Sequence, residues 1–507
     1  MVNPLKKYYK LSAFLLGASG VASMPPFYIF PALILAFSGL LYISDKTDSY
    51  KKSFMVGYLF GFGFFSFGFL WVGNAVLIEP EKTGWLYPLI FLASGAYFGL
   101  FAAVPTMIIN RAKNMFLKIF MFAAAWTIFE WVRGWFLTGF PWNPIGSATA
   151  FNPLFIQSAS IWGVYGLSFL TVLFCSLPAA FVKGKKSAIA ALILMAAIFG
   201  GDIIFGFLRL PDKTELSDTK VRLVQPSIPQ ELKWNKETME SNFQQYVDLS
   251  SKAGLDDVDF VMWGETASPF NPRFHYDYIE SYQKATPKTG YLVFGMIDYE
   301  YTFGDVFLKN AMLVMDKTGE IVGAYDKMHL VPFGEYIPLR RYLPSYVRPL
   351  ANLVGELKEG KEHNVISLEN KPAFGGLICY EVIFPAEVVD KKNRPEWIAV
   401  LTNDGWYGIS AGPYQHLVAA QFRAAEEGLP IVRSANSGIS AVIDPFGRIT
   451  AKIGLAEKGF VDAAIPKAIS PTFFAEYGNF PILLLCLIFL VLCLFLNEIF
   501  AEKNPRG

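Results

Sequence analysis

The first 210 residues consist of long apolar stretches separated by short polar loops, and one further apolar stretch lies near the end of the chain. A helix needs about 20 mostly apolar residues to cross a bilayer. The pattern predicts eight such helices, at residues 11–22, 27–43, 53–73, 86–109, 115–133, 162–182, 188–207 and 480–497. The chain is therefore expected to cross a membrane several times.

The basic residues of this region occur in alternate loops. They are Lys6, Lys7 and Lys10, then Lys46, Lys51 and Lys52, then Arg111, Lys113 and Lys118, and finally Lys183, Lys185 and Lys186. Short cytoplasmic loops of membrane proteins are enriched in Lys and Arg. This distribution predicts a cytoplasmic N-terminus, and seven spans would bring residue 210 to the opposite side of the membrane.

Between residues 211 and 475 the pattern changes to short apolar runs mixed with helical stretches such as 413–427. The runs are VRLVQ, DFVMWGE, YLVFGMI, NAMLVMD, FGGLICY, WIAVLTND, IVRSANSGISAVID and GFVDAAI. Strands that are apolar throughout are typical of sheets covered on both faces. We therefore predict a layered α/β domain at 211–475, between a membrane domain at 1–210 and a last helix with a short tail at 476–507.

Composition narrows the possible partners. The chain is 53% hydrophobic and only 17% charged, and its 44 Lys and Arg residues nearly balance its 43 Asp and Glu residues. It lacks the global positive charge that attracts nucleic acid. It also has no GxxxxGK[ST] loop, and no GxGxxG sequence joins a predicted strand to a helix. The sequence thus favours lipid as a partner and predicts no nucleotide cofactor, and its cysteines and histidines lack the spacing of a metal site.

Cys379 is the only cysteine outside the predicted spans, and it ends the apolar run FGGLICY. It is either a core residue or a nucleophile, and a nucleophilic thiol needs a nearby base or cation. His329 and His416 are candidate bases. Neither has an Asn or Asp in a recognisable context to orient it.

A carboxylate base is the alternative. Glu265 follows the apolar run DFVMWG, where apolar surroundings are expected to raise its pKa. Lys327 and Glu335 lie in DKMHLVPFGEYIP, and a lysine near the thiol would favour a thiolate and stabilise an oxyanion. Each residue alone also fits a simpler interpretation, as a turn carboxylate, a salt-bridge partner or a solvated lysine.

Taken in order and at roughly even spacing, Glu265, Lys327 and Cys379 resemble the Glu-Lys-Cys triad of the nitrilase superfamily. The resemblance implies an α-β-β-α sandwich. It also implies that the glutamate is the general base, that the lysine supports the oxyanion, and that the cysteine forms an acyl-enzyme.

Longer segments narrow this resemblance. The chain resembles the apolipoprotein N-acyltransferases, the membrane-bound branch of that superfamily, in EWVRGWFLTGFPWNPIG, LVQPSIPQELKWN, KMHLVPFGEYIP, CYEVIFP and the stretch from TNDGWYG to VIDPFG. The resemblance implies a membrane phospholipid as acyl donor, a diacylglyceryl apolipoprotein as acceptor and no cofactor. It adds Trp234, Glu335, Tyr380 and Glu381 as supporting or substrate-binding residues. It also implies a bacterial inner membrane, with the catalytic domain on the periplasmic side.

Two other functions remain open at this point. One is a membrane-tethered amidase, in which water replaces the lipoprotein amine, and the triad alone does not distinguish it. The other is a transporter or receptor with a ligand-binding outer domain. The predicted spans contain few acidic residues for a transport pathway, since Glu130 and Asp202 are the only candidates.

Three segments have two interpretations each. The aromatic stretches 269–282 and 339–355 are typical either of arms that dip into lipid headgroups or of loops packed over a core. Glu130 and Arg133 lie one helical turn apart and could pair, either for structure or to contact substrate.

Overall fold

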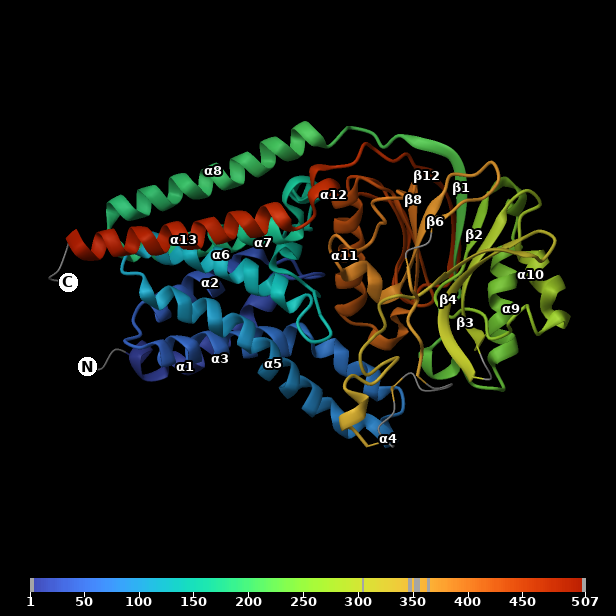
Figure 1. Ribbon diagram of the computed structural model, residues 1–507, viewed down its shortest axis with the longest axis horizontal. Helices are drawn as coiled ribbons and strands as arrows, with labels where there is room; N and C mark the ends of the chain where they lie inside the picture. Colours follow the sequence, from blue (N-terminus) through green and yellow to red (C-terminus); the bar gives the residue numbers. More distant parts are fainter. Residues whose placement is uncertain (1–3, 303–304, 345–348, 351–355, 363–364, 504–507) are drawn as a thin grey trace. The chain divides into compact units, whose positions relative to one another are not determined.

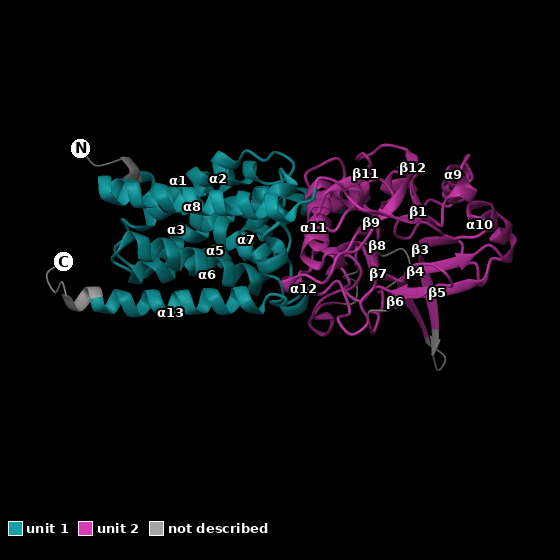
Figure 2. Ribbon diagram, turned by 90° about the horizontal axis from the view of Figure 1, so that it is seen from above, with its two compact units in different colours: residues 1–73, 83–211, 476–507 teal, residues 74–82, 212–475 magenta. Residues whose placement is uncertain are grey.

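The computed structural model describes residues 4–302, 305–344, 349–350, 356–362 and 365–503 (Figure 1). The chain forms two compact units, which Figure 2 shows in different colours. The first contains Met1–Gly73, Thr83–Pro211 and Glu476–Gly507, and the second contains Asn74–Lys82 and Asp212–Ala475. Residues distant in sequence thus belong to one unit, because the last helix joins the first 211 residues while Asn74–Lys82 joins the sheets.

The first unit is a bundle of long helices (Figure 1). They are α1 (Pro4–Gly20), α2 (Phe30–Ser44), α3 (Tyr50–Gly68), α5 (Tyr87–Ile108), α6 (Met115–Arg133), α7 (Ala159–Ser176), α8 (Lys185–Arg209) and α13 (Phe480–Lys503). The short α4 (Pro80–Thr83) falls mostly within the segment Asn74–Lys82 of the second unit. Glycines allow α3 to approach its neighbours closely, since a Cβ on Gly63 would lie 2.3 Å from the Phe14 carbonyl oxygen and one on Gly61 2.8 Å from Gly99 Cα. Small residues play this part in membrane helix packing.

Five helical stretches of the described residues are long and apolar enough to cross a membrane. They are Pro80–Arg111, Met115–Arg133, Ala159–Lys183, Lys185–Arg209 and Phe480–Ile499. A sixth span results if Tyr50–Gly68 and Leu70–Leu77, bent by 45°, are counted together. The other two predicted spans fall on α1 and α2, which have 17 and 15 residues. The chain is a membrane protein, and the number of eight spans stays a prediction.

Ion pairs gather several loops at one end of this bundle. Asp45, just after α2, binds Lys118 Nζ at 2.8 Å and Lys183 Nζ at 2.7 Å. The Asn110 amide also donates to Thr47 Oγ1 at 3.0 Å. Three of the four groups of alternate basic residues therefore lie together.

Glu130 and Arg133 both hold the loop that follows α6. Arg133 Nη1 donates to the carbonyl oxygens of Phe140 (2.7 Å) and Trp142 (2.9 Å), while Glu130 Oε1 accepts from the Ile145 N–H at 2.8 Å. Both residues therefore have a structural role in the bundle.

The second unit contains two six-stranded sheets, one ordered β12-β1-β2-β3-β4-β5 and the other β11-β10-β9-β8-β7-β6. The strands are β1 (Leu216–Gln225), β2 (Phe260–Met262), β3 (Tyr291–Thr302), β4 (Asp305–Asp316), β5 (Ile321–Asp326), β6 (Val365–Ile366), β7 (Phe374–Ile378), β8 (Trp397–Thr402), β9 (Ile431–Ala435), β10 (Ser440–Ile443), β11 (Ile449–Ile453) and β12 (Gly459–Pro466). In each sheet the central strands β1-β2-β3 or β7-β8-β9 run parallel. The two sheets share this plan.

The sheets pack face to face. Phe260 and Met262 of β2 lie in one core with Phe374 and Trp397 of the second sheet, while the intervening Val261 lies in a second core. That second core includes Phe243 of α9 (Met239–Ser250) and Tyr282 of α10 (Ile279–Ala285). Helix α11 (Gly412–Glu427) packs on β9 and β10 of the second sheet, on the opposite side from α9 and α10 (Figure 1). The predicted α-β-β-α sandwich is confirmed.

Candidate active site

Three predicted site residues each come directly after a strand or within a few residues of one. Glu265 follows β2, Lys327 follows β5, and Cys379 follows β7 of the other sheet. The Glu265 N–H donates to the carbonyl of Thr402, the last residue of β8, at 3.3 Å. A Cβ on Gly264 would lie 2.8 Å from the Asn436 nitrogen, so glycine allows this close approach between the sheets.

Lys327 connects two carboxylates inside the protein. Its Nζ lies 3.2 Å from Glu265 Oε1 and 2.9 Å from Glu335 Oε1, and only 1% of its side chain is exposed. The Asn310 amide donates to the same two oxygens, at 2.8 and 2.9 Å. The Val331 N–H binds the other Glu335 oxygen at 2.7 Å. The carboxylates and the ammonium are therefore held in fixed positions before any substrate arrives.

The charges of this cluster set the protonation of the thiol and its neighbours. Burial and the Glu265 carboxylate raise the pKa of Cys379 to about 12, against the opposing effect of Lys327. For Glu265, burial alone raises the pKa, but Lys327, Lys233 and hydrogen bonds from Asn310 and the Cys379 thiol outweigh it, so the pKa falls below its usual value. The expectation of a raised pKa for Glu265 was wrong, because the apolar strand ends among cations. The resting pair is a thiol and a carboxylate in hydrogen-bond contact.

Glu381 connects the ends of β5 and β7. Its Oε1 accepts from the N–H groups of Met328 (2.7 Å) and His329 (3.1 Å) and from the Tyr325 hydroxyl (2.8 Å). Its Oε2 accepts from the Ile378 N–H at 2.6 Å. Burial raises the pKa of Glu381 to about 7, although these donors lower it. One buried carboxylate thus fixes the backbone next to Lys327 and next to Cys379.

Tyr380 comes directly after Cys379, and Trp234 comes directly after Lys233. Tyr380 is buried, and its ring packs on Phe384 with 5.2 Å between centroids. Trp234 is half-buried. Its neighbour Lys233 is buried, and Lys233 Nζ donates to the Glu265 carbonyl oxygen and to Thr266 Oγ1, both at 2.8 Å. Sequence reasoning selected Trp234 and missed Lys233 in the same motif.

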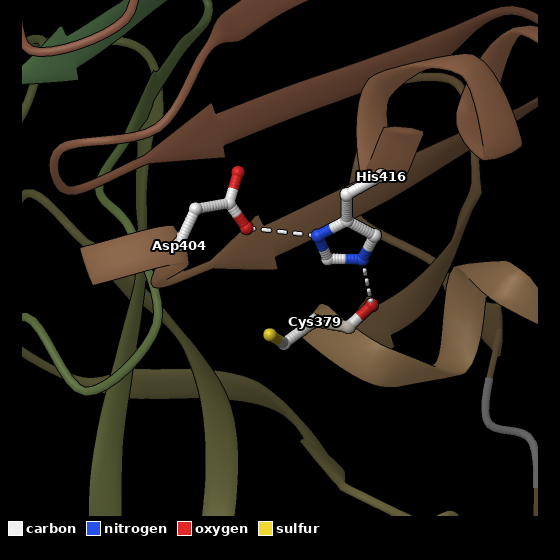
Figure 3. A group of neighbouring side chains, drawn as sticks. All are labelled: Cys379, Asp404 and His416. Atoms are coloured by element: carbon white, nitrogen blue, oxygen red, sulfur yellow. Dashed lines mark hydrogen bonds and ion pairs between the residues drawn. The ribbon is translucent and has the colours of Figure 1, made fainter. Parts of the chain in front are cut away.

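His416 is close to Cys379 but contacts its backbone. His416 Nε2 donates to the Cys379 carbonyl oxygen at 3.0 Å, and Nδ1 lies 2.8 Å from Asp404 Oδ1. Figure 3 shows that the sulfur points away from the imidazole. Arg433 binds Asp404 Oδ2 at 2.7 Å and completes a buried group. The structure thus supplies the orienting aspartate that was not recognised in the sequence, yet it directs this histidine to the carbonyl.

Cys379, Asp404 and His416 offer ligand atoms within 4.8 Å of one another, as a metal site would. Their hydrogen bonds do not fit that role, because Nε2 faces a carbonyl and Nδ1 faces Asp404 and, at 3.1 Å, Arg433. Burial and the charge of Arg433 lower the pKa of His416. The other candidate base, His329, stacks on Phe384 at 3.8 Å, and its Nδ1 lies 3.9 Å from Glu387.

The two aromatic segments divide between core and surface. In 269–282, Phe270 and Tyr282 pack in the core, whereas Phe274 and Tyr276 are exposed. In 339–355, Leu339 and Tyr342 are exposed, and residues 345–348 and 351–355 lie outside the described residues. Each segment therefore presents apolar side chains to its surroundings.

Comparison with known proteins assigns both units. Residues 16–177 match the family model of the apolipoprotein N-acyltransferase N-terminal domain, and residues 220–472 match that of the carbon-nitrogen hydrolases. An apolipoprotein N-acyltransferase of Rhodopseudomonas palustris is 36% identical, over 98% of this chain and 95% of its own length. The chain belongs to the apolipoprotein N-acyltransferase family.

Other members of the apolipoprotein N-acyltransferase family agree with this assignment. The one from Rickettsia typhi is 37% identical over 97% of this chain and 99% of its own length. Among solved structures, Nit3 of Saccharomyces cerevisiae, a nitrilase-superfamily member, covers 50% of the chain at 18% identity with a TM-score of 0.36. The family assignment rests on the sequence relatives and the two family models.

Proposed function

We propose that this chain transfers an acyl chain from the sn-1 position of a membrane phospholipid to the α-amino group of the N-terminal diacylglyceryl-cysteine of an apolipoprotein. The observation that carries the proposal is the buried cluster of Cys379, Glu265 and Lys327, in a chain of this family. Glu265 and Lys327 are in ion-pair contact at 3.2 Å, and the thiol is hydrogen-bonded to Glu265. The transfer runs through a thioester on Cys379, in two half-reactions.

In the first half-reaction Glu265 accepts the thiol proton while the sulfur attacks the ester carbonyl. The high pKa of Cys379 keeps the resting thiol protonated, so proton transfer accompanies attack. The C–S bond forms, the ester C–O bond breaks, and the proton passes from Glu265 to the departing glycerol oxygen. Lys327 stabilises the oxyanion of the tetrahedral intermediate. A lysophospholipid leaves.

In the second half-reaction the lipoprotein amine attacks the thioester. The C–N bond forms and the C–S bond breaks. A proton of the amine passes through Glu265 to the Cys379 sulfur, which restores the thiol. An amide is more stable than a thioester or an ester, so the transfer needs no nucleotide and no cofactor.

The remaining predicted residues support these steps. Glu335 balances the charge of Lys327 and, with Asn310, fixes its position. Glu381 holds the backbone on both sides of the site. Tyr380 supplies the N–H that follows the nucleophile, and the half-buried Trp234 forms part of the substrate-binding surface.

The proposal includes a location. The chain lies in a bacterial inner membrane, with a cytoplasmic N-terminus and a periplasmic catalytic domain. Its seven-helix membrane domain covers 1–210, its catalytic domain 211–475, and its last helix with a short tail 476–507. Both substrates are anchored in the bilayer, and the exposed Phe274, Tyr276, Leu339 and Tyr342 are suited to contact it.

The test is mass spectrometry of the full-length protein after incubation with phospholipid, followed by addition of a diacylglyceryl lipopeptide with a free α-amine. We expect one acyl mass on the peptide that contains Cys379, and its transfer to the lipopeptide. Cys379→Ala should remove the adduct. Release of free fatty acid without lipopeptide acylation would instead indicate an amidase-like hydrolase, and full acyl transfer by Cys379→Ala would remove the thiol from the mechanism.

A further inference from the structure

Lys233 is a buried lysine that the mechanism above does not use. It lies in the loop before α9, and its residue is 6% exposed. The loop is fixed at two points before it. Asn436 exchanges hydrogen bonds with the backbone of Ile228, and the Asn242 amide donates to the Leu232 carbonyl at 2.9 Å. The position of the Lys233 ammonium is therefore fixed.

The ammonium contacts the backbone of Glu265, the proposed base. Lys233 Nζ donates to the Glu265 carbonyl oxygen and to Thr266 Oγ1, each at 2.8 Å. Thr266 has a φ of 45°, in the left-handed region that residues other than glycine rarely adopt. The contact holds the chain in this turn, directly beside the carboxylate.

A neutral donor would serve that purpose at lower cost, because burying an unpaired ammonium is expensive. The two hydrogen-bond acceptors of Lys233 are uncharged, so its charge must be balanced by other groups. Burial lowers the pKa of Lys233 to about 8, while Glu265 and Cys379 act in the opposite direction. The charge of Lys233 thus acts on the carboxylate and the thiol of the site.

Several charged and titratable groups surround Glu265. The facing groups are Lys327, Lys233, the Cys379 thiol, Glu335 through its shared lysine, and the hydroxyl of Tyr407. With Glu265 and Glu335 ionised and the thiol protonated, the two lysines balance the two carboxylates. Without Lys233, Glu265 and Glu335 share one lysine, which also interacts with Glu381, a carboxyl whose pKa burial raises to about 7.

We propose that Lys233 is a positioning residue of the acyl-transfer site, which fixes the main chain at Glu265 and keeps its carboxylate ionised in the free enzyme. This inference rests on the proposed function, because it assigns Lys233 a role through the base of that reaction. The acylation rate should rise with pH as Glu265 ionises, and this rise is called the acid limb. Removing the charge of Lys233 makes Glu265 harder to ionise, so the acid limb moves to higher pH.

The test measures the rate of adduct formation on Cys379 against pH. The full-length protein is mixed with subsaturating phosphatidylethanolamine that carries palmitate at sn-1, so that the rate reports ionisation in the free enzyme. The variants are Lys233→Gln, which keeps N–H donors, Lys233→Met and Lys233→Arg. Lys236→Met is the matched control, since Lys236 is an exposed lysine of the same loop.

We expect both neutral variants to shift the acid limb upward by about one pH unit, which below the limb is about tenfold in rate, and to recover at high pH. Lys233→Arg and Lys236→Met should keep the wild-type limb. A uniform loss of rate without a shift would make Lys233 purely structural and overturn the inference. If neither neutral variant folds, the test rests on Lys233→Arg. An acid limb that shifts in this variant overturns the inference, and an acid limb that stays at the wild-type pH supports it. Absence of any adduct in the wild type would instead count against the proposed function.

Discussion

Cys379 occupies a backbone conformation that costs energy for any residue except glycine. Its φ is 53°, in the left-handed region where the Cβ is crowded. Such conformations persist only where surrounding contacts enforce them. Here the Ile378 N–H binds Glu381 before the cysteine, and the Cys379 carbonyl binds His416 after it. The proposed nucleophile is held through its main chain, while its thiol is hydrogen-bonded to Glu265.

Replacing Glu265 tests which residue takes the thiol proton. Glu265→Gln retains the shape of the side chain but removes the basic oxygen, so we expect acylation of Cys379 to fall by about 10²–10⁴-fold. The measurement is the time course of the acyl adduct by mass spectrometry. A variant that accumulates the thioester at the normal rate would show that another group is the base.

Replacing His416 separates the carboxylate base from a histidine base. In His416→Ala the buried Cys379 carbonyl loses its donor, which should lower the free energy of unfolding by about 1–3 kcal/mol and slow acylation. The pH at which acylation rises should stay where it is, because Glu265 remains. His329→Ala, at the half-exposed histidine, is the control and should be neutral in both assays.

Thermal unfolding and the pH profile of adduct formation check this prediction. If His416→Ala abolished acylation as completely as Glu265→Gln while the protein stayed folded, and if the acid limb disappeared, the histidine would have to be reinstated as the base.

For single residues, the sequence predicted which side chains form the site better than it predicted their pKa values. Glu265 and Cys379 could be found because each follows an apolar run, and Lys327 because it lies between them in the motif DKMHLVPFGEYIP. Lys233 could not, because one lysine in a polar loop looks solvated until the fold buries it. The lowered pKa of Glu265 depends on cations from distant segments. Asp404 contacts His416 across the start of α11, a contact that no spacing rule identifies.

Among the elements, β5 and β7 belong to different sheets. Their ends must nevertheless keep a fixed distance from each other for Lys327 to face the thiol. Hydrogen bonds within a sheet do not connect them. Glu381 does so, since one oxygen binds the backbone after β5 and the other binds the end of β7. The distance between the ammonium and the sulfur therefore depends on a residue that touches neither reacting atom.

Glu381→Gln should weaken this connection. An amide nitrogen replaces one accepting oxygen and then faces a backbone N–H. Because hydrogen bonds to charged groups contribute about 1.5–3 kcal/mol each, we expect a loss of about 3 kcal/mol in the free energy of unfolding and slower acylation at every pH. Denaturant unfolding and the adduct assay measure the two effects.

Glu387→Gln is the control for that substitution, since this glutamate is mostly exposed and is expected to change neither quantity. Wild-type stability and acylation in Glu381→Gln would show that the two strand ends are held by other contacts.

The elements found most closely from sequence are buried on both faces, although β1 and β12, which are partly exposed, were predicted as well. Strands β2, β7, β8 and β9 are almost entirely buried and were predicted at nearly their observed positions. Strands β5 and β11 were missed, because alternate residues of each are exposed and dilute the apolar signal. Helix α9 was missed as well, since its buried face includes Asn242 and Ser250.

For the whole molecule, the distribution of basic residues determines which side of the membrane each part is expected to occupy. The contacts of Asp45 with Lys118 and Lys183 place three basic loops at one end of the helical unit. Asn497 of α13 also exchanges hydrogen bonds with the backbone of Arg111 and Lys113 there. Because short cytoplasmic loops collect Lys and Arg, this end is expected to face the cytoplasm and the catalytic domain the periplasm.

Labelling with a membrane-impermeant maleimide on spheroplasts tests this orientation. Cys379→Ala removes the only thiol outside the apolar helices, and Cys175, Cys486 and Cys493 are buried. On that background Lys392→Cys presents a thiol on the surface of the catalytic unit, and Lys185→Cys presents one at the basic end of the bundle. We expect Lys392→Cys to react in intact spheroplasts and Lys185→Cys to react only after lysis. The opposite pattern would place the catalytic domain in the cytoplasm and the lysine-rich end outside it, contrary to the enrichment of Lys and Arg in cytoplasmic loops.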